Sequence, residues 1–105
     1  MAMNEHGDLV IIVDSELRAL VPQFLRTKRA DIADTIGALE RNDYNTAVRV
    51  GHQLKGEGSA FGFDKVTAMG AKLELAATSA DQCVALRWAR ALAEFLDHVE
   101  VRFSA

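Results

Sequence analysis

The sequence predicts an all-α protein, folded as an antiparallel up-down four-helix bundle with a kinked long first helix. Apolar residues recur at intervals of three and four along most of the 105 residues. Helix-capping residues and breaks divide the chain into four helical stretches, which contain only one proline. The connections between these stretches are short, and short connections favour antiparallel neighbours.

Composition favours a small cytoplasmic protein with one domain. Half of the residues are apolar, which is enough for one hydrophobic core at this length. Cys83 is the only cysteine, so no disulfide framework is expected. The net charge is −3 and the basic residues are scattered, which argues against nucleic acid as a partner. The longest apolar run, Leu9 to Val13, is too short to cross a membrane, and residues 1–8 lack the basic run of a signal peptide.

The first part of the chain is expected to form a lead-in, residues 1–13, followed by the bundle domain, residues 14–105. Within the lead-in, residues 9–13 predict a short extended or irregular segment that caps one end of the core. Asp14 then offers helix-capping chemistry for a long first helix that runs to about Arg41. Pro22 is expected to kink this helix or to split off its first turns. Apolar residues at helical spacing define its inner face: Leu17, Leu20, Val21, Phe24, Ile32, Ile36 and Leu39.

Three further helices follow from breaks and caps in the sequence. The second is expected to begin after Asp43 and to end near Gly62. The third begins at Asp64 and runs to the break before Asp81, which opens a fourth helix ending at about Arg102. The predicted inner faces are, in order, Ala47, Gly51, Leu54 and Gly58; Val66, Met69, Leu73 and Ala76; and Val84, Trp88, Leu92, Phe95 and Val99.

The second helix carries a histidine, a lysine and a glycine one turn apart, at His52, Lys55 and Gly56. A glycine within a helix is less favourable than alanine by about 1 kcal/mol. Gly51 and Gly58 lie on the predicted inner face, where glycines allow helices to pack closely, but Gly56 lies on the outer face beside the histidine. A lone helical histidine is commonly a surface or structural residue. The bare backbone next to it indicates a functional site instead.

The stretch from Gly51 to Phe63, with His52-Gln53-Leu54-Lys55-Gly56 at its centre, resembles the signature of histidine-containing phosphotransfer (HPt) domains. That signature is His-x-Leu-Lys-Gly, then small residues, then glycine. Leu73-Glu74 followed by Ala76-Ala77 is similar to a second sequence block of the family. Pro22-Gln23-Phe24-Leu25 is similar to a first helix common in free-standing members, so the resemblance covers about residues 17–103.

A phosphocarrier needs a nucleophile that accepts and returns a phosphoryl group. Histidine suits this role because much of an ordinary imidazole is neutral at physiological pH. His52 is the predicted phosphorylation site, and Gly56 gives clearance for the partner. Lys55 and Arg49 flank the histidine and could neutralise phosphoryl charge or contact an acidic partner, so Arg49, Lys55 and Gly56 are the predicted docking residues. A solvated surface charge is the alternative for Arg49.

Two further residues are candidate supports of the phosphoryl site. Ser59 could donate a hydrogen bond to a phosphoryl oxygen or could be only a small helical residue. The resemblance implies that Glu74 accepts a hydrogen bond from Nδ1 of His52, which leaves Nε2 as the phosphorylated atom. An ordinary surface acid is the alternative for Glu74. A metal site formed by His52 and Glu74 is not expected, because two ligands are too few and His6 and His98 fall in other elements.

The sequence contains no phosphate-binding loop of the Gly-x-x-x-x-Gly-Lys type and no acidic cluster suited to Mg²⁺. The protein is therefore expected to be a passive carrier, not an enzyme, with no cofactor. The resemblance implies partners that are receiver domains of response regulators, a sensor histidine kinase, or both. A complete bundle offers no obvious apolar stripe, so a monomer is expected. The alternative function is a helical adaptor in which His52 is never phosphorylated.

Overall fold

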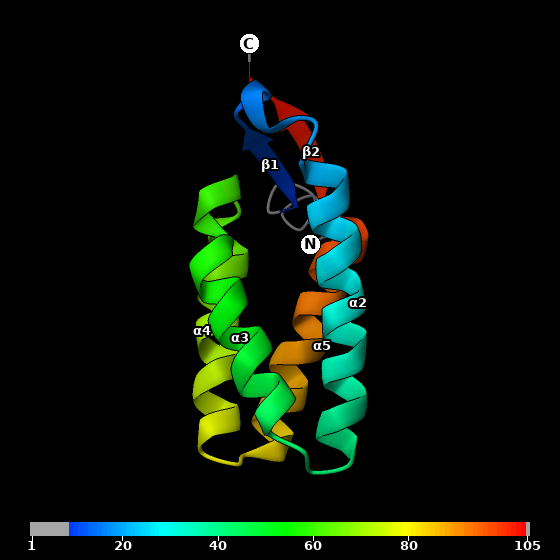
Figure 1. Ribbon diagram of the computed structural model, residues 1–105, viewed down its shortest axis with the longest axis vertical. Helices are drawn as coiled ribbons and strands as arrows, with labels where there is room; N and C mark the ends of the chain where they lie inside the picture. Colours follow the sequence, from blue (N-terminus) through cyan, green and yellow to red (C-terminus); the bar gives the residue numbers. More distant parts are fainter. Residues whose placement is uncertain (1–8, 105) are drawn as a thin grey trace, which may run out of the picture.

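The computed structural model describes residues 9–104, and the predicted four helices are confirmed within them (Figure 1). Two short strands and two 3₁₀ helices accompany the helices. Residues 1–8, the first part of the expected lead-in, lie outside the described residues. In chain order the elements are β1 Val10–Val13, η1 Ser15–Leu17, α2 Val21–Glu40, α3 Asn45–Glu57, η2 Ser59–Phe61, α4 Asp64–Thr78, α5 Gln82–His98 and β2 Glu100–Phe103.

Successive helices reverse direction along the length of the molecule (Figure 1). Helix α2 runs away from the strand pair, α3 runs back toward it, α4 runs away again, and α5 returns to β2. Helix α3 packs against α4, and α5 packs against both α2 and α4. The strands β1 and β2 lie together at one end of the bundle.

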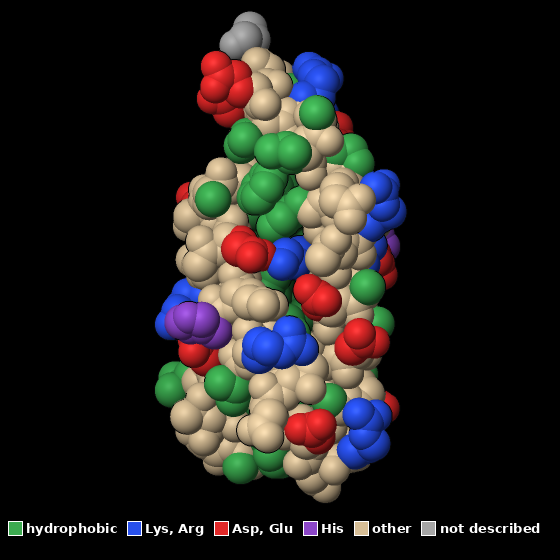
Figure 2. Space-filling model, in the orientation of Figure 1, with side chains coloured by type: hydrophobic (Ala, Val, Ile, Leu, Met, Phe, Trp, Pro, Cys, Tyr) green, Lys and Arg blue, Asp and Glu red, His purple; other side chains and the backbone are tan. Residues whose placement is uncertain are grey.

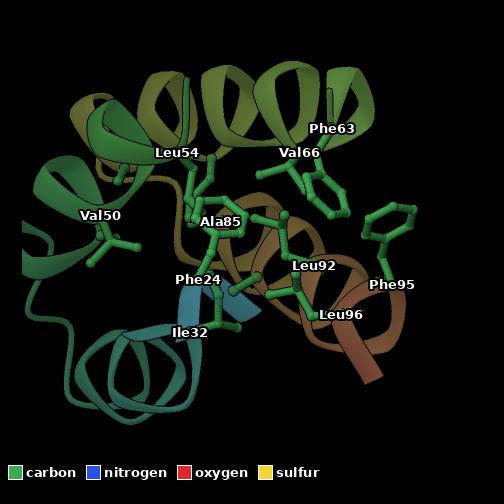
Figure 3. Close-up of a cluster of buried hydrophobic side chains, with 14 of the residues drawn as sticks. Phe24, Ile32, Val50, Leu54, Phe63, Val66, Ala85, Leu92, Phe95 and Leu96 are labelled. Carbon is green, nitrogen blue, oxygen red and sulfur yellow. The ribbon is translucent and has the colours of Figure 1, made fainter. Parts of the chain in front are cut away.

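The hydrophobic core runs between the four helices, and each of them contributes buried side chains (Figure 3). The largest side chains with almost no exposed surface come from all of these elements and from the segment before α4. Because this burial removes apolar surface from water, it is the main term that stabilises the bundle. The set includes Ile32, Leu39, Leu54, Phe63, Val66, Leu73, Leu92 and Leu96.

The first helical region is divided rather than continuous. Asp14 caps the short η1, where its side chain accepts a hydrogen bond of 2.9 Å from the backbone nitrogen of Glu16. Helix α2 begins only at Val21, and Pro22 lies in its first turn. Proline is tolerated at this position, since a first-turn nitrogen has no partner within the helix to lose. Of the two expected effects of Pro22, the structure shows the second: the first turns are separated from α2 as η1. Helix α2 has no proline in its interior.

The fourth helix is shorter than predicted, because α5 ends at His98 and not near Arg102. Residues 100–103 form β2, which pairs with β1 in parallel; Val10 lies opposite Glu100 and Val13 opposite Phe103. The physical reason is visible in the sequence. Apolar and polar residues alternate from Val99 to Phe103, which is the period of a strand rather than a helix.

The connections around α3 and α5 follow local chemistry. Helix α3 ends at Glu57, earlier than the predicted end near Gly62, and η2 fills the interval. Gly62 has φ +82°, a left-handed conformation that glycine adopts without strain. The predicted cap at Asp81 is confirmed, since its carboxylate accepts a hydrogen bond of 3.2 Å from the backbone nitrogen of Val84.

Candidate functional site

Close packing of α3 against α4 sets the geometry of the site. A Cβ atom added to Gly51 would lie 2.8 Å from the backbone nitrogen of Glu74 and 2.9 Å from the carbonyl oxygen of Gly70. A Cβ atom on Gly70 would lie 2.8 Å from Cβ of Leu54. Neither contact is possible for a larger residue without a shift of the helices. The two glycines therefore let the backbones touch and bring Glu74 beside the histidine of α3.

His52 stands on the outer face of α3, with 69% of its side chain exposed. Its Nδ1 atom lies 3.1 Å from Oε2 of Glu74. An ionised carboxylate can only accept a hydrogen bond, so this contact selects the tautomer in which Nδ1 carries the proton. Within residues 9–104, Nε2 has no hydrogen-bond partner. The ring is thus held through one nitrogen, and its other nitrogen keeps a free lone pair.

Glu74 joins the histidine to a lysine of the same helix. Its second oxygen, Oε1, lies 2.8 Å from Nζ of Lys55, and only 22% of the Glu74 side chain is exposed. The hydrogen bond from Lys55 is the main reason that the pKa of Glu74 lies below its ordinary value. The contact with His52 lowers the pKa further, while partial desolvation opposes both. Glu74 is therefore ionised at neutral pH and acts as the acceptor for both neighbours.

Gly56 lies one turn beyond His52 on the same face of α3. A Cβ atom added there would meet no protein atom within 4 Å, and the backbone is in ordinary helical conformation. Neither packing nor φ requires a glycine at this position. Glycine there leaves an open strip of backbone beside the imidazole. Figure 2 shows a histidine side chain at the surface, with a basic and an acidic side chain next to it.

The sequence profile described as the Hpt domain matches residues 19–101, about four fifths of the chain. The chain belongs to the Hpt domain family. Hpt domains are phosphocarrier modules that transfer phosphoryl groups through histidine in phosphorelays, where they interact with receiver domains and kinases. Neither the curated proteins nor the solved structures contain a significant match to this chain.

The other two predicted site residues lie nearby but make no contact with the histidine of this Hpt domain. Arg49 is exposed on the outer face of α3 and has no ion pair or hydrogen bond within residues 9–104. Ser59 lies beyond the end of α3, in η2, and its Oγ atom is 3.0 Å from Oγ1 of Thr67 on α4. The structure thus brings together His52, Lys55 and Glu74.

Sequence reasoning missed one residue that shapes the Hpt site. Gly70 faces Gly51 across the contact between α3 and α4, and it precedes Glu74 by one turn. The available signal was an isolated glycine inside a helical pattern, which commonly has a packing reason. Without knowledge of which helix faces which, that signal could not identify its partner.

The described part of this Hpt domain has neither a candidate metal centre nor a candidate membrane span. Among residues 9–104, no group of three or more His, Cys, Asp or Glu side chains could hold a metal ion. His6, considered above as a metal ligand, lies outside that range. None of the described helices is long and apolar enough to span a membrane.

Proposed function

We propose that this Hpt domain accepts a phosphoryl group on Nε2 of His52 and passes it to or from receiver-domain aspartates. The observation that carries the proposal is the exposed ring, held at Nδ1 by Glu74 and unobstructed at Nε2. The antiparallel up-down bundle gives this ring a rigid support. Docking uses the outer face of α3 around Arg49, Lys55 and Gly56.

The proposed transfer requires only a nucleophile and a stabilising charge from this chain. The lone pair of Nε2 attacks the phosphorus atom of an aspartyl phosphate, and a P–N bond forms. The bond from phosphorus to the aspartate oxygen breaks, and its electron pair leaves with the carboxylate. Nδ1 keeps its proton, so the phosphorylated ring is positively charged, and the carboxylate of Glu74 stabilises that charge at 3.1 Å. The reverse sequence returns the phosphoryl group.

The supporting residues contribute through charge and clearance. Lys55 is 44% exposed and contacts Glu74 through one oxygen, so its ammonium group can also approach a phosphoryl oxygen on the neighbouring ring. Gly56 lets the surface of a receiver approach in line with Nε2. A role for Ser59 at the phosphoryl group stays a prediction, because its hydroxyl contacts Thr67.

The partner supplies the remaining chemistry in this proposal. Phosphoryl transfer needs a metal ion and a positioned acceptor, both of which belong to the receiver or kinase. We propose a cytoplasmic monomer that forms small, transient interfaces, since a relay must release each partner. The protein is not itself a kinase under this proposal.

The test is transfer of labelled phosphate from each phosphorylated receiver of the source organism, or from an active histidine kinase. The expected label is acid-labile and alkali-stable, is absent from His52→Gln, and persists in the control His98→Gln. A label that survives in His52→Gln would place the phosphoryl group elsewhere. If no donor labels the protein while a partner still binds both variants equally, the adaptor alternative replaces the carrier.

A further inference from the structure

A second surface feature lies away from the histidine, between the start of α2 and the end of the chain. It is a groove of about 440 Å³ that is lined by apolar side chains, here called its floor, and by three arginines, here called its rim. The floor includes Leu25 of α2 together with Val101 and Phe103 of β2. The rim is formed by Arg18, Arg26 and Arg29. No acidic side chain is among the described residues that line the groove.

Two of the three guanidinium groups keep most of their hydrogen-bonding capacity. The guanidinium carbon of Arg18 lies over the Phe103 ring, 4.4 Å from its centre, and a cation–π contact of this kind uses none of the five N–H donors of the guanidinium group. Arg26 donates one hydrogen bond, of 2.7 Å, to the side chain of Gln23. Neither arginine forms an ion pair with another residue of the 9–104 range, whereas Arg102 pairs with Glu100.

The third guanidinium group is fixed in place. Arg29 donates hydrogen bonds of 3.0 and 2.8 Å from Nε and Nη2 to the carbonyl oxygen of Leu96, and its Nε lies 3.8 Å from the carboxylate of Asp97. It therefore stabilises the last turn of α5 and forms a rigid wall of the groove. The positive charge available to a ligand comes mainly from Arg18 and Arg26.

The groove and the histidine occupy different parts of the bundle. The groove belongs to the border of α2 with the end of α5 and with β2, whereas His52 and Glu74 belong to α3 and α4. In Figure 1 these two helix pairs lie on opposite sides of the bundle near the strand pair. A ligand in the groove would leave the ring of His52 accessible.

We propose that this groove binds an acidic peptide segment of a partner protein, with an apolar side chain of that segment placed on the floor. The ligand is identified as acidic by charge complementarity. Guanidinium groups without ion pairs, next to an apolar surface, favour carboxylates that flank an apolar side chain. The role is a second contact that retains a partner while its other parts engage the histidine, which raises the effective concentration of the partner. Binding of the peptide does not depend on the phosphocarrier role, whereas the retention of a relay partner rests on that proposed function.

Another groove in the described structure shows no such preference for a ligand of one charge. It lies between α4 and α5, with half-buried Met69 and Trp88 in its wall. Its lining includes Lys65 and Lys72 together with Glu94, so charges of both signs face a ligand there. The groove at α2 and β2 has arginines alone on its rim, and only that groove specifies the chemistry of its ligand.

The test is a titration of isotopically labelled protein with the capped peptide Glu-Asp-Leu-Phe-Asp-Glu, followed by amide chemical shifts. Saturable binding is expected, with the largest shifts at groove amides such as Leu25 and Val101 and none at His52. Added salt should weaken the binding. The capped peptide Lys-Lys-Leu-Phe-Lys-Lys is the control and should not bind. Equal affinity for the two peptides, or shifts that map to α3 and α4, would overturn the proposal.

Paired variants localise the charge. Arg18→Gln combined with Arg26→Gln should weaken binding of the acidic peptide by about tenfold or more. Arg41→Gln combined with Arg87→Gln removes the same charge from elsewhere on the surface and should leave the affinity unchanged. Equal losses in the two double variants would reduce the effect to net charge and refute a site. Binding to phosphatidylglycerol vesicles in preference to the peptide, or concentration-dependent dimerisation with the same shifts, would replace the proposed occupant.

Discussion

Helix α3 has two surfaces, and each contains a glycine with a different reason to be there. Gly51 lies on the inner surface, where an added Cβ atom would be 2.8 Å from the backbone of α4. Gly56 lies on the outer surface, where an added Cβ atom would meet nothing within 4 Å. Both have the same unfavourable helix propensity. The fold explains the first glycine and offers no explanation for the second.

The contrast between Gly51 and Gly56 separates the part of α3 that serves packing from the part that serves function. At Gly51 the absence of a side chain is needed to bring Glu74 to the histidine. At Gly56 the absence of a side chain leaves open surface beside the same histidine. The inner surface thus positions the proposed carrier, and the outer surface keeps it accessible to a second protein.

Gly56→Leu should have the largest effect. Transfer to or from a receiver is expected to fall by about a hundredfold, because a bulky side chain beside His52 displaces the partner from its in-line position. The free energy of unfolding should stay the same or rise, since leucine favours a helix more than glycine does. Transfer rates and urea denaturation measure the two quantities. Normal transfer by Gly56→Leu would refute the clearance argument.

Gly51→Ala is the matched change on the inner surface. The added methyl group must separate α3 from α4, so the free energy of unfolding should fall by about 1–3 kcal/mol. Urea denaturation measures this loss, with Gly56→Ala as the control that should gain about 0.5–1 kcal/mol. If the two alanine variants have the same stability, the contrast between the surfaces is wrong.

Glu74→Ala tests whether the contact between Glu74 and His52 supports phosphorylation of the ring. Loss of the acceptor at Nδ1 should slow phosphorylation of His52 by about tenfold, in the range known for groups that orient a histidine ring. Glu74→Gln keeps an acceptor but loses the charge, so an intermediate rate is expected. Glu16→Ala, an exposed acid at the other end of the chain, is the control. Unchanged rates and an unchanged phosphohistidine lifetime in Glu74→Ala would make Glu74 an ordinary surface acid.

The smallest effect concerns pH and stability. Because the pKa of Glu74 is lowered in the folded protein, its ionised form favours folding, and this contribution is complete above the ordinary value of 4.5. The contribution decreases as pH falls through the lower pKa of the folded state. The difference in unfolding free energy between the wild-type protein and Glu74→Gln should therefore shrink below about pH 4.5. A difference that grows as pH falls would contradict the direction of the shift.

Much of the fold could be predicted from periodicity and capping, and the missed strand pair has a physical cause. The predicted cap at Asp81 was found where expected, since capping chemistry acts within a few residues. The strand β2 was missed because four residues of alternating pattern follow a strongly periodic helix. Its partner β1 lies at the other end of the chain, and local signals cannot report such a pairing.

The candidate site was predicted residue by residue to different extents. His52 and Gly56 could be placed on one outer face from helical spacing alone. The contact of Glu74 with His52 was implied by the resemblance, and the structure has the two side chains in hydrogen-bonding distance. The ion pair of Glu74 with Lys55 was not foreseen, because it depends on how closely α3 and α4 approach, which two facing glycines determine.

The parallel pairing of β1 with β2 has a consequence for the order of folding. It joins residues separated by 90 positions in sequence, whereas successive helices are linked by short connections. Closing so long a loop is entropically unfavourable until the helices have already brought its ends together. The strands should therefore form last, and their amides should exchange with solvent before those of the bundle interior. A partner bound to the strand pair would therefore slow the opening of this end of the molecule.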